Sequence, residues 1–548
     1  MLASPAVGVL FPWNQCTNSQ CRSMTMSLPN SRSWPFRASW CFWLSVFAVL
    51  ILLSPSEATA TFRFVNDLEP YGSLTGSGTK FRDVTISDRD TVTVFWAAGF
   101  PKGEATFSYL FCQRLSEQGQ PISAAERISS DTLSSIVNWI HMGSNSMGKW
   151  VLVNHLVLAK ALDRFDDLGL MVWTSDSVGR FAGVEHTVGN EVQSQANSRW
   201  GCAGVDDAGN YAVCWANNQE PDGSSVWCQL FDSGNSPRTP VVTVSDIHTR
   251  PDLELRDQRN VKAAMSPQGR LIVVWQAGCD SCPPVAWAPH VFFRLYGLDG
   301  RPLTGIRCAS CDDSGNNKAN VSGMYPDVAM QANGDFALVW RQYRYDCDIK
   351  IMLRRFNADG IDKGLPLVVD SNLCHFDATP NVASDSIGNL VVVWQDDEGD
   401  GRRLTDLKAK RYLPNGMQVG EEFKINDGDR NVLPFTTPVA LNNNGLVGFL
   451  WGELRRSSED GKIQQHDMMQ LMDLRDVGVY LCGDANNDRI IDRRDAIFLI
   501  TYVLGQGQSP ASLDHSDLNC DGIVDLADIV RLVGCLAGGD IRQTLCPQ

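Results

Sequence analysis

The residues most clearly suited to chemistry lie in two short runs rich in aspartate and asparagine. Both follow the pattern D-x-N-x-D-x-[hydrophobic]-x-D-x-x-D, and they start 33 residues apart, at Asp484 and Asp517. Calcium prefers oxygen ligands, which such a loop supplies from side chains at positions 1, 3, 5, 9 and 12 and from a backbone carbonyl at position 7. The pattern therefore predicts two Ca²⁺ sites. The predicted ligands are Asp484, Asn486, Asp488, Ile490, Asp492 and Asp495 in the first loop, and Asp517, Asn519, Asp521, Ile523, Asp525 and Asp528 in the second.

Each loop runs into an amphipathic stretch, residues 496–504 and 529–536, which predicts one short helix after each loop. Two loop and helix units with Asp rather than Glu at position 12 resemble a type I dockerin, over residues 482–538. The resemblance implies a small α-helical, EF-hand-like module that holds one Ca²⁺ per unit and docks to a cohesin-like protein. The alternative, a solvated acidic tail, does not explain the regular apolar positions.

The two units differ from each other at positions that bear on binding. Position 6 of the first loop is Arg489, where a sharp turn favours glycine, so we expect weaker Ca²⁺ binding there than in the loop containing Gly522. Positions 10 and 11 carry cohesin recognition in the dockerin family. They are Arg493-Arg494 in one unit and Leu526-Ala527 in the other, so the usual two-way docking is not expected to be symmetrical.

A second group of polar residues follows a tryptophan that recurs along the chain. Carboxylates, amides and an arginine on one face suit hydrogen bonding to a glycan or protein ligand, and they are the clustered candidates for acid-base work. The alternative is that they are ordinary polar loop residues. The candidates are Glu220, Gln276, Arg341, Gln395, Asp396, Asp397 and Glu453.

Motifs that would identify an enzyme are absent from the sequence. There is no G-x-S-x-G, no H-E-x-x-H and no phosphate loop, and turns such as residues 384–388 match the Asp-box of sialidase-like propellers only in part. We therefore assign no catalytic residue and expect a binding protein rather than an enzyme. If the chain is an enzyme, we expect a hydrolase acting on O-glycosyl bonds of a polysaccharide.

The cysteines are numerous and include two C-x2-C pairs, Cys279 with Cys282 and Cys308 with Cys311. Their spacing would suit a zinc site inside a cell, but in an exported protein disulfides are favoured. The even count of 14 cysteines beyond residue 60 favours disulfides in general. Suggested pairs are Cys347 with Cys374 and Cys482 with Cys546.

The elements that must position these residues form a repeat. Seven apolar runs recur, with key positions at residues 96, 154, 215, 275, 340, 394 and 451, separated by 54 to 65 residues. Six end in Trp and the second has Asn154 instead. A Gly stands six residues before each key position, except in the first copy, which has Asp90. Each copy predicts a hairpin around that turn and then a second strand pair, which is the four-stranded blade of a propeller.

The fold class that follows is an all-β seven-bladed propeller with a small C-terminal α-helical module. The repeats resemble bacterial secreted propellers with the pattern VAxxxxGxxxVVW…RFxxxG, over residues 62–475. The seventh copy lacks a good fourth strand, so we expect residues 62–66 to complete it and seal the ring. An array of separate β-sandwiches is the alternative. The predicted domains are a signal peptide at 1–60, a propeller at 61–480 and a dockerin-like module at 481–548.

The N-terminal region has the three parts of a secretory signal. Residues 40–53 are apolar but too short to span a bilayer comfortably, Arg32 and Arg37 precede them, and the triplet Ala58-Thr59-Ala60 offers a cleavage site. We expect a secreted or cell-surface protein with no membrane span in the mature chain, although an uncleaved anchor is the alternative. The net charge of −16 disfavours nucleic acid as a partner.

Three functions remain open at this stage. The first is a binding or assembly protein, with the propeller as a platform and the calcium module as its docking element. The second is a polysaccharide-active hydrolase or lyase that carries a dockerin. The third is a structural surface protein in which the calcium module only stabilises its own end of the chain.

Overall fold

The structure is a computed structural model. It describes residues 63–65, 82–102, 105–129, 135–161, 164–188, 198–220, 223–245, 255–279, 289–311, 321–344, 348–373, 379–396, 405–426, 432, 437–456, 463–474, 485–486, 493–505, 507–510, 516–518 and 523–536. The predicted signal peptide and its cleavage site lie outside these residues. Among the described residues, no helix is both long enough and apolar enough to cross a membrane.

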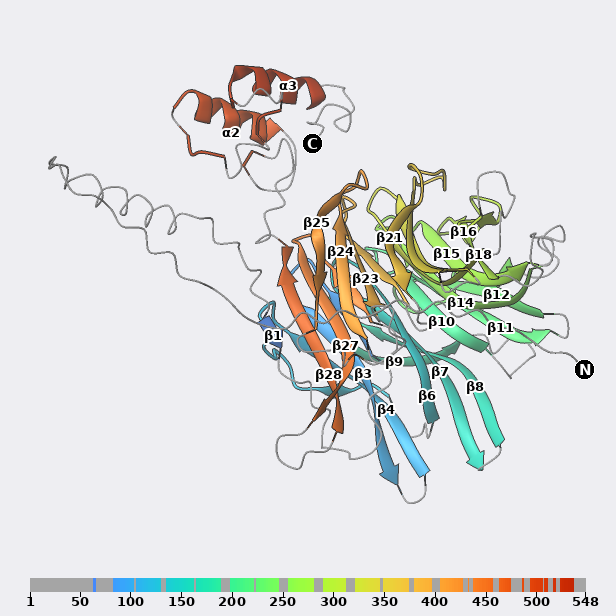
Figure 1. Cartoon of the computed structure of the whole chain (residues 1–548). Helices are drawn as coiled ribbons and strands as arrows, with labels where there is room; N and C mark the ends of the chain where they lie inside the picture. Colours follow the sequence, from blue (N-terminus) through green and yellow to red (C-terminus); the bar gives the residue numbers. More distant parts are fainter. Residues whose placement is uncertain are drawn as a thin grey trace, which may run out of the picture. The chain divides into compact units, whose positions relative to one another are not determined.

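Within the described residues, 28 strands form seven four-stranded antiparallel sheets, which follow one another around a ring (Figure 1). The predicted seven-bladed propeller is thus confirmed. Blade 1 contains β2 (Arg82–Ile86), β3 (Val92–Lys102), β4 (Ala105–Leu115) and β5 (Glu126–Arg127). Blade 2 contains β6 (Ser135–Ser144), β7 (Trp150–Ala161), β8 (Arg164–Ser175) and β9 (Phe181–Val188). Blade 3 contains β10 (Ser198–Val205), β11 (Tyr211–Glu220), β12 (Gly223–Phe231) and β13 (Val242–Ser245).

The remaining blades repeat this order. Blade 4 contains β14 (Leu255–Met265), β15 (Leu271–Cys279), β16 (Pro289–Tyr296) and β17 (Arg307–Cys308). Blade 5 contains β18 (Val321–Met330), β19 (Phe336–Arg344), β20 (Asp348–Phe356) and β21 (Leu367–Leu373). Blade 6 contains β22 (Asn381–Ser384), β23 (Leu390–Asp396), β24 (Asp406–Tyr412) and β25 (Gln418–Lys424). Blade 7 contains β26 (Val439–Leu441), β27 (Leu446–Arg456), β28 (Ile463–Asp473) and β1 (Arg63–Val65).

The hydrophobic core lies between successive blades. Strand β23, the second strand of blade 6, is buried along its whole length, and the residues up to the key position of the other second strands are buried as well. One core cluster joins blades 3 and 4 and another joins blades 5 and 6. Val, Ile and Trp suit this environment because branched and aromatic side chains pack well on a pleated surface. This packing explains why the apolar run is the best-preserved part of the repeat.

The hairpin between the first and second strands requires a left-handed backbone at one position. Gly148, Gly209 and Gly269, and their counterparts in blades 5 to 7, have φ between 81° and 102° at the turn. Asp90, which replaces this Gly in blade 1, has φ of 56°. Glycine adopts this conformation without steric cost, and aspartate tolerates it better than most residues. The turn geometry explains the Gly in the repeat and its one exception.

The ring closes as the sequence predicts. Strand β1 pairs antiparallel with β28, with Arg63 opposite Leu471 and Val65 opposite Met469. The closing strand therefore comes from the opposite end of the propeller segment, and Figure 1 shows it beside β28. Hydrogen bonds between hairpin turns add to this closure, since Asn442 Nδ2 donates to the Ser87 carbonyl at 2.9 Å.

The two predicted C-terminal helices are also present. Helix α2 spans Arg493–Val503 and helix α3 spans Leu526–Leu536. Their shared core repeats at an interval of 33 residues, the same interval that separates the two loops. The core residues are Ala485, Ala496 and Leu499 from the first unit, and Leu518, Ile529 and Leu532 from the second.

Candidate functional site

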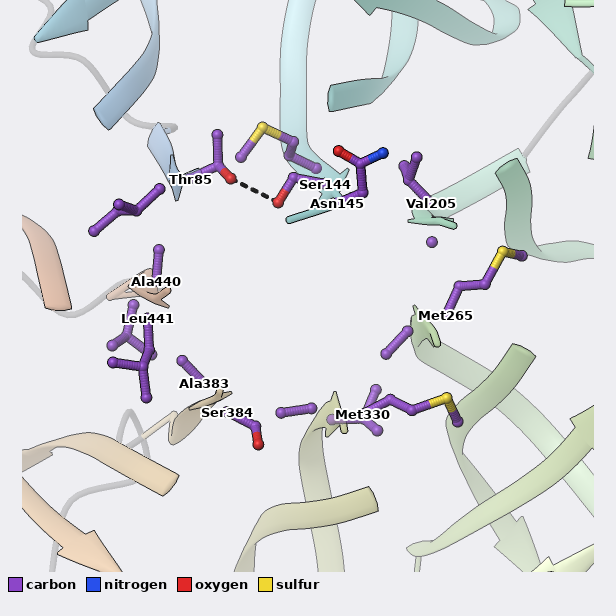
Figure 2. A pocket seen from close by; sticks show the side chains of 18 of the residues that line it. Thr85, Ser144, Asn145, Val205, Met265, Met330, Ala383, Ser384, Ala440 and Leu441 are labelled. Atoms are coloured by element: carbon purple, nitrogen blue, oxygen red, sulfur yellow. Dashed lines mark hydrogen bonds between the residues drawn. The ribbon is translucent and has the colours of Figure 1, made fainter. Parts of the chain in front are cut away.

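The central channel of the propeller contains a cavity of about 300 Å³. The first strands of all seven blades line it, and turn residues such as Asp88 and Ser386 lie at the hairpin end. Figure 2 shows the side chains arranged around an opening, with Thr85 donating a hydrogen bond to Ser144 Oγ at 2.6 Å. The wall is mixed, with Met265, Met330 and Leu441 beside serine and threonine hydroxyls. Polar atoms contribute more of the lining than apolar atoms, which suits a polar ligand better than an apolar one.

Four titratable side chains meet in this channel, on strands β2, β6, β14 and β18. Lys262 Nζ lies 3.4 Å from His141 Nδ1 and 3.6 Å from Asp327 Oδ1. Asp83 accepts hydrogen bonds from the backbone N–H groups of Val84 at 2.9 Å and Met142 at 3.0 Å. Asp327 likewise accepts one at 2.9 Å from the N–H of Val382 in the next blade. The cluster joins neighbouring blades while presenting charge to the cavity.

This cluster is not among the predicted site residues, although the repeat contains a signal for it. Each member stands three residues before the end of the first strand of its blade and seven residues before the turn position. Superposing the seven repeats on the turn therefore places them in one column. That column reads Asp83, His141, Cys202, Lys262, Asp327, Asn381 and Pro438.

Burial changes the protonation of two members of the cluster. Removal from water raises the pKa of Asp83 to about 7, against the lowering effects of its two backbone N–H donors and of Lys262. Burial, and then the Lys262 cation, holds the pKa of His141 well below its usual range. Near neutral pH the channel therefore holds a neutral imidazole and a carboxyl group close to its titration point.

The raised pKa of Asp83 predicts how the free energy of unfolding depends on pH. Its folded-state pKa lies above the value near 3.9 of an unfolded chain, so its favourable contribution is complete below about pH 4 and is lost as the pH rises through 7. Raising the pH from 5 to 8 should lower the free energy of unfolding of the propeller by about 1 to 3 kcal/mol more than in Asp83→Asn. Urea unfolding followed by Trp fluorescence in saturating calcium measures this. Equal pH slopes for the two proteins would contradict it.

The polar residues predicted after each tryptophan lie mostly inside strands rather than in loops. Strands β15, β19, β23 and β27 continue past their tryptophans. The described candidates are all buried, namely Gln276, Arg341, Gln395, Asp396 and Glu453. The side chain of Glu220, at the end of β11, and the whole of Asp397 lie outside the described residues. None of the five described candidates lines the channel cavity.

Several of these buried residues have structural partners. Asp396 forms an ion pair with Lys408 at 2.5 Å, and Glu453 accepts a hydrogen bond from Trp451 Nε1 at 3.0 Å. Gln276 Oε1 accepts hydrogen bonds from Asn260 Nδ2 at 3.0 Å and from the Tyr325 N–H at 3.2 Å. Their assignment as ligand-binding residues remains a prediction.

Two of the candidates converge on a residue that sequence analysis did not select. Tyr325 has φ of 51°, which is unfavourable for a bulky side chain, and it is 38% exposed. Gln276 holds its backbone N–H, and the guanidinium of Arg341 lies 4.5 Å from the centre of its ring. Strained residues persist where the surroundings enforce them, and they cluster at functional sites. Asn260, the equivalent residue of blade 4, has φ of 53°, so this conformation recurs in the repeat, and the case for ligand contact at Tyr325 rests on its exposed ring.

In the C-terminal module, the aspartate at position 12 of each predicted loop is fully buried at the start of its helix. Asp495 Oδ1 accepts a hydrogen bond from the Asn486 N–H at 3.2 Å. Asp528 Oδ1 accepts one from Leu518 at 2.6 Å, and its Oδ2 accepts one from Asp525 at 2.8 Å. Each carboxylate thus folds back onto its own loop.

This donor set fits calcium. A buried carboxylate is costly unless positive charge and hydrogen bonds compensate it, and calcium takes several oxygen ligands at once. Among the predicted ligands, the structure describes Asn486, Asp495, Asp517, Ile523, Asp525 and Asp528. The other six, Asp484, Asp488, Ile490, Asp492, Asn519 and Asp521, lie outside the described residues.

The two helices also expose apolar residues at matching positions. Ile497 and Ile500 on α2 correspond to Val530 and Val533 on α3, again 33 residues apart, and all four are at least 40% exposed. The stripe of α3 begins with the exposed Leu526, whereas that of α2 begins with Arg493. The two stripes therefore differ at their ends: that of α3 starts beside its calcium loop with Leu526, whereas that of α2 continues at the other end through Val503 to the adjoining Leu504.

The cysteines follow the prediction only in part. Cys308 and Cys311 form a disulfide, which confirms the disulfide interpretation for that C-x2-C pair. The general expectation of disulfides is wrong for Cys112, Cys202, Cys214 and Cys228, which are free thiols. All four lie within the hydrophobic core, where a thiol packs as a small apolar group. The other suggested pairs, Cys347 with Cys374 and Cys482 with Cys546, lie outside the described residues.

A comparison with solved structures finds proteins whose sequences are only distantly similar to this chain. The polysaccharide lyase Uly1 has a TM-score of 0.44 at 9% identity, over 74% of this chain and 91% of the lyase. The NanB sialidase of Streptococcus pneumoniae has a TM-score of 0.39 at 9% identity, over 76% and 71% of the two chains. An α-L-arabinofuranosidase of Fusarium graminearum has a TM-score of 0.39 at 10% identity, over 75% and 98%. At these values the likeness says nothing about activity.

No curated protein matches this chain. A family model does match its last part: residues 482–536 match the Dockerin type I domain. That segment includes both loops, both buried position-12 carboxylates and both helices. The chain therefore carries a dockerin type I domain after a seven-bladed β-propeller.

Proposed function

We propose that this protein is a secreted docking protein, in which the propeller at 61–480 is a binding platform and the calcium-loaded module at 481–548 attaches it to a cohesin-like partner. Dockerin domains bind calcium and cohesins, and the match at residues 482–536 supports both here. The observation that carries the proposal is the exposed apolar stripe of α3, which stands directly on the predicted calcium loop. We propose two Ca²⁺ ions, one per loop, held by the ligands given above.

The stripe has the chemistry of a docking surface. Leu526, Val530 and Val533 occupy positions i, i+4 and i+7, so they lie on one face of α3, and each is at least 48% exposed. Exposed apolar residues grouped on one helix face mark interaction sites, because burying them against a partner is favourable. The calcium loop fixes the start of the helix and so orients this face.

Because the apolar stripe of α3 starts beside its calcium loop with Leu526, where α2 has the charged Arg493, we expect docking in one orientation, through α3. Leu526→Asp with Val530→Asp should weaken binding to a cohesin at least 100-fold, since each buried aliphatic side chain contributes about 1.5 to 3 kcal/mol. The equivalent change in α2, Arg493→Asp with Ile497→Asp, should weaken it less than fivefold. Isothermal titration calorimetry of the full chain against a panel of recombinant cohesins measures both.

All four substituted side chains lie at the module surface, so the helix signal in calcium provides the folding control. Equal losses from the two double variants would mean that both faces dock. Wild-type binding by both would exclude the helix faces altogether. Absence of binding to every cohesin would favour the structural alternative, in which the module only stabilises the chain.

The propeller offers two places for the ligand of such a platform. The first is the exposed ring of Tyr325, held by Gln276 and Arg341, which suits stacking on a sugar ring with hydrogen bonds from its neighbours. The second is the channel cavity with its charged cluster. We propose a glycan at the Tyr325 surface, and binding to a polysaccharide panel, compared between wild type and Tyr325→Ala, tests it.

A second candidate function is a glycoside hydrolase, and Asp83 is the observation that favours it. A carboxyl group with a pKa near 7 in a cavity can donate a proton, and Asp327, which acts electrostatically on it, is a second carboxylate. In this candidate Asp83 is the general acid and Asp327 is the base. Release of reducing sugar from the same panel, abolished by Asp83→Asn and retained by Tyr325→Ala, would support hydrolysis. Absence of turnover on every polysaccharide would contradict the hydrolase function and favour the binding platform.

A further inference from the structure

The outer edge of blade 4 contains a disulfide next to a histidine. Cys308 is the last residue of β17, the outermost strand of the blade, and it is bonded to Cys311. His290 lies on the adjacent strand β16. One ring nitrogen of His290 and both sulfur atoms lie within 4.8 Å of one another. Nothing in the proposed docking or glycan-binding roles uses this group.

Hydrogen bonds hold the short loop between the two cysteines in place. The N–H of Cys311 donates to Cys308 Sγ at 3.1 Å, and the N–H of Val291 donates to Ser310 Oγ at 3.0 Å. Arg354 Nη1 donates to the carbonyls of Ala309 at 2.8 Å and Cys311 at 3.3 Å. The loop is thus anchored by β16 and by β20 of blade 5, independently of the sulfur–sulfur bond. Opening that bond would leave these anchors intact.

The environment of this disulfide differs from that of the other described cysteines. Cys308 and Cys311 are half-buried, whereas Cys202, Cys214 and Cys228 are at most 3% exposed in the core between blades 3 and 4. Exchange between a thiol and a disulfide requires an incoming thiolate to reach one sulfur atom. Among the described cysteines, therefore, the pair on blade 4 is the one that can react while the protein stays folded.

We propose that Cys308 and Cys311 form a redox-active disulfide that exchanges with external thiols, either small thiols or protein dithiols. An incoming thiolate attacks Cys311 Sγ, a bond forms between the two, the Cys308–Cys311 bond breaks, and its electron pair leaves on Cys308 as a thiolate. A second thiolate attacks the incoming sulfur and releases Cys311. The sum is two external thiols oxidised to one disulfide and one protein disulfide reduced to two thiols.

The direction of attack follows from the hydrogen bonding. The leaving sulfur develops negative charge, and exchange is faster when that charge is stabilised. The N–H of Cys311 points at Cys308 Sγ, so Cys308 is the better leaving group. Burial lowers the pKa of His290 to about 4, so its imidazole stays neutral near neutral pH and adds no positive charge beside the sulfur atoms.

The test uses the full mature chain with saturating calcium and reduced glutathione. Under native conditions Cys308 and Cys311 should become accessible to iodoacetamide together, while Cys202, Cys214 and Cys228 react only after denaturation. Peptide mass spectrometry reads each site. A Cys308–Cys311 peptide that stays bonded in excess glutathione, while the same peptide is reduced after unfolding, would overturn the proposal.

Variants test the direction of the exchange. Incubated with oxidised glutathione at neutral pH, Cys311→Ser should accumulate a glutathione adduct on Cys308 at least threefold faster than Cys308→Ser accumulates one on Cys311, because the N–H of residue 311 stabilises the Cys308 thiolate that attacks. Cys112→Ser, which removes a buried thiol of blade 1, is the matched control and should behave as wild type. Equal rates in the two variants would overturn the assignment of Cys308 as the leaving sulfur. The wild-type measurement stands even where a variant folds poorly.

Discussion

Removal of calcium should unfold the module at residues 482–536 and leave the propeller folded. Each predicted loop gathers four aspartates, whose charges repel one another without the ion. Among the described residues, the module core holds six buried apolar side chains, and a core of that size does not fold a segment of about 55 residues without a metal or other staple. Chelation should therefore abolish the helix signal of α2 and α3, and the fluorescence of the propeller tryptophans should not change.

Circular dichroism of the isolated segment, with and without chelator, gives the helix content directly. Calorimetry should find two sites, and the loop containing Gly522 should bind at least tenfold more tightly than the loop containing Arg489, because glycine permits the sharp turn. Arg489→Gly should bring the two affinities together. A helix content that does not change on chelation would remove the calcium assignment.

Position 12 provides a sharper version of the same test. Asp528→Asn keeps the size of the side chain and one of its two acceptor oxygens, but it removes a buried negative charge. The variant should lose one calcium site, by about 100-fold or more in affinity, if that charge faces the ion. The matched variant is Asp495→Asn, the equivalent change in the first unit, which should remove the first site and spare the second. An unchanged affinity in Asp528→Asn would mean that its two backbone hydrogen bonds are its whole role.

The propeller was predictable because its determinants are local and repeated. A short segment is enough to predict an apolar strand, a turn that requires positive φ or a closing strand. Because the repeat occurs seven times, the pattern is not a chance match. Asp90 shows how far this extends, since it occupies the turn position of the first copy and adopts the same left-handed backbone as the glycines. The calcium loops were predictable for the same reason, because their ligands follow one another within 12 positions.

The channel cluster was not predicted because its members are far apart in the sequence. Asp83, His141, Lys262 and Asp327 come from four blades, and only the ring closure brings their side chains together. The residues after each tryptophan illustrate the opposite error. They were expected at loop ends, but strands such as β19 and β27 continue past the tryptophan, so these side chains pack inside the sheet. Strand length depends on tertiary pairing, which a short pattern does not contain.

Deletion of the closing strand should destabilise the propeller more than any single surface substitution. Strand β1 covers the edge of β28 through the pairing of Phe64 with Gln470 and its two neighbours. Without it, the N–H and C=O groups along that edge lose their partners and the edge becomes a template for aggregation. Each lost backbone hydrogen bond costs about 1 kcal/mol, so the expected loss in free energy of unfolding is about 2 to 4 kcal/mol.

A matched pair of chains separates this effect from the removal of the leader. One chain begins at Thr61 and retains β1, and the other begins at Asp67 and lacks it. The shorter chain should unfold at lower urea concentration and form oligomers by light scattering, whereas the longer chain stays monomeric. The hydrogen bonds between turns, such as Asn442 with Ser87, remain in both chains and should keep blade 7 docked against blade 1. Equal stability and solubility of the two chains would show that these turn contacts close the ring without β1.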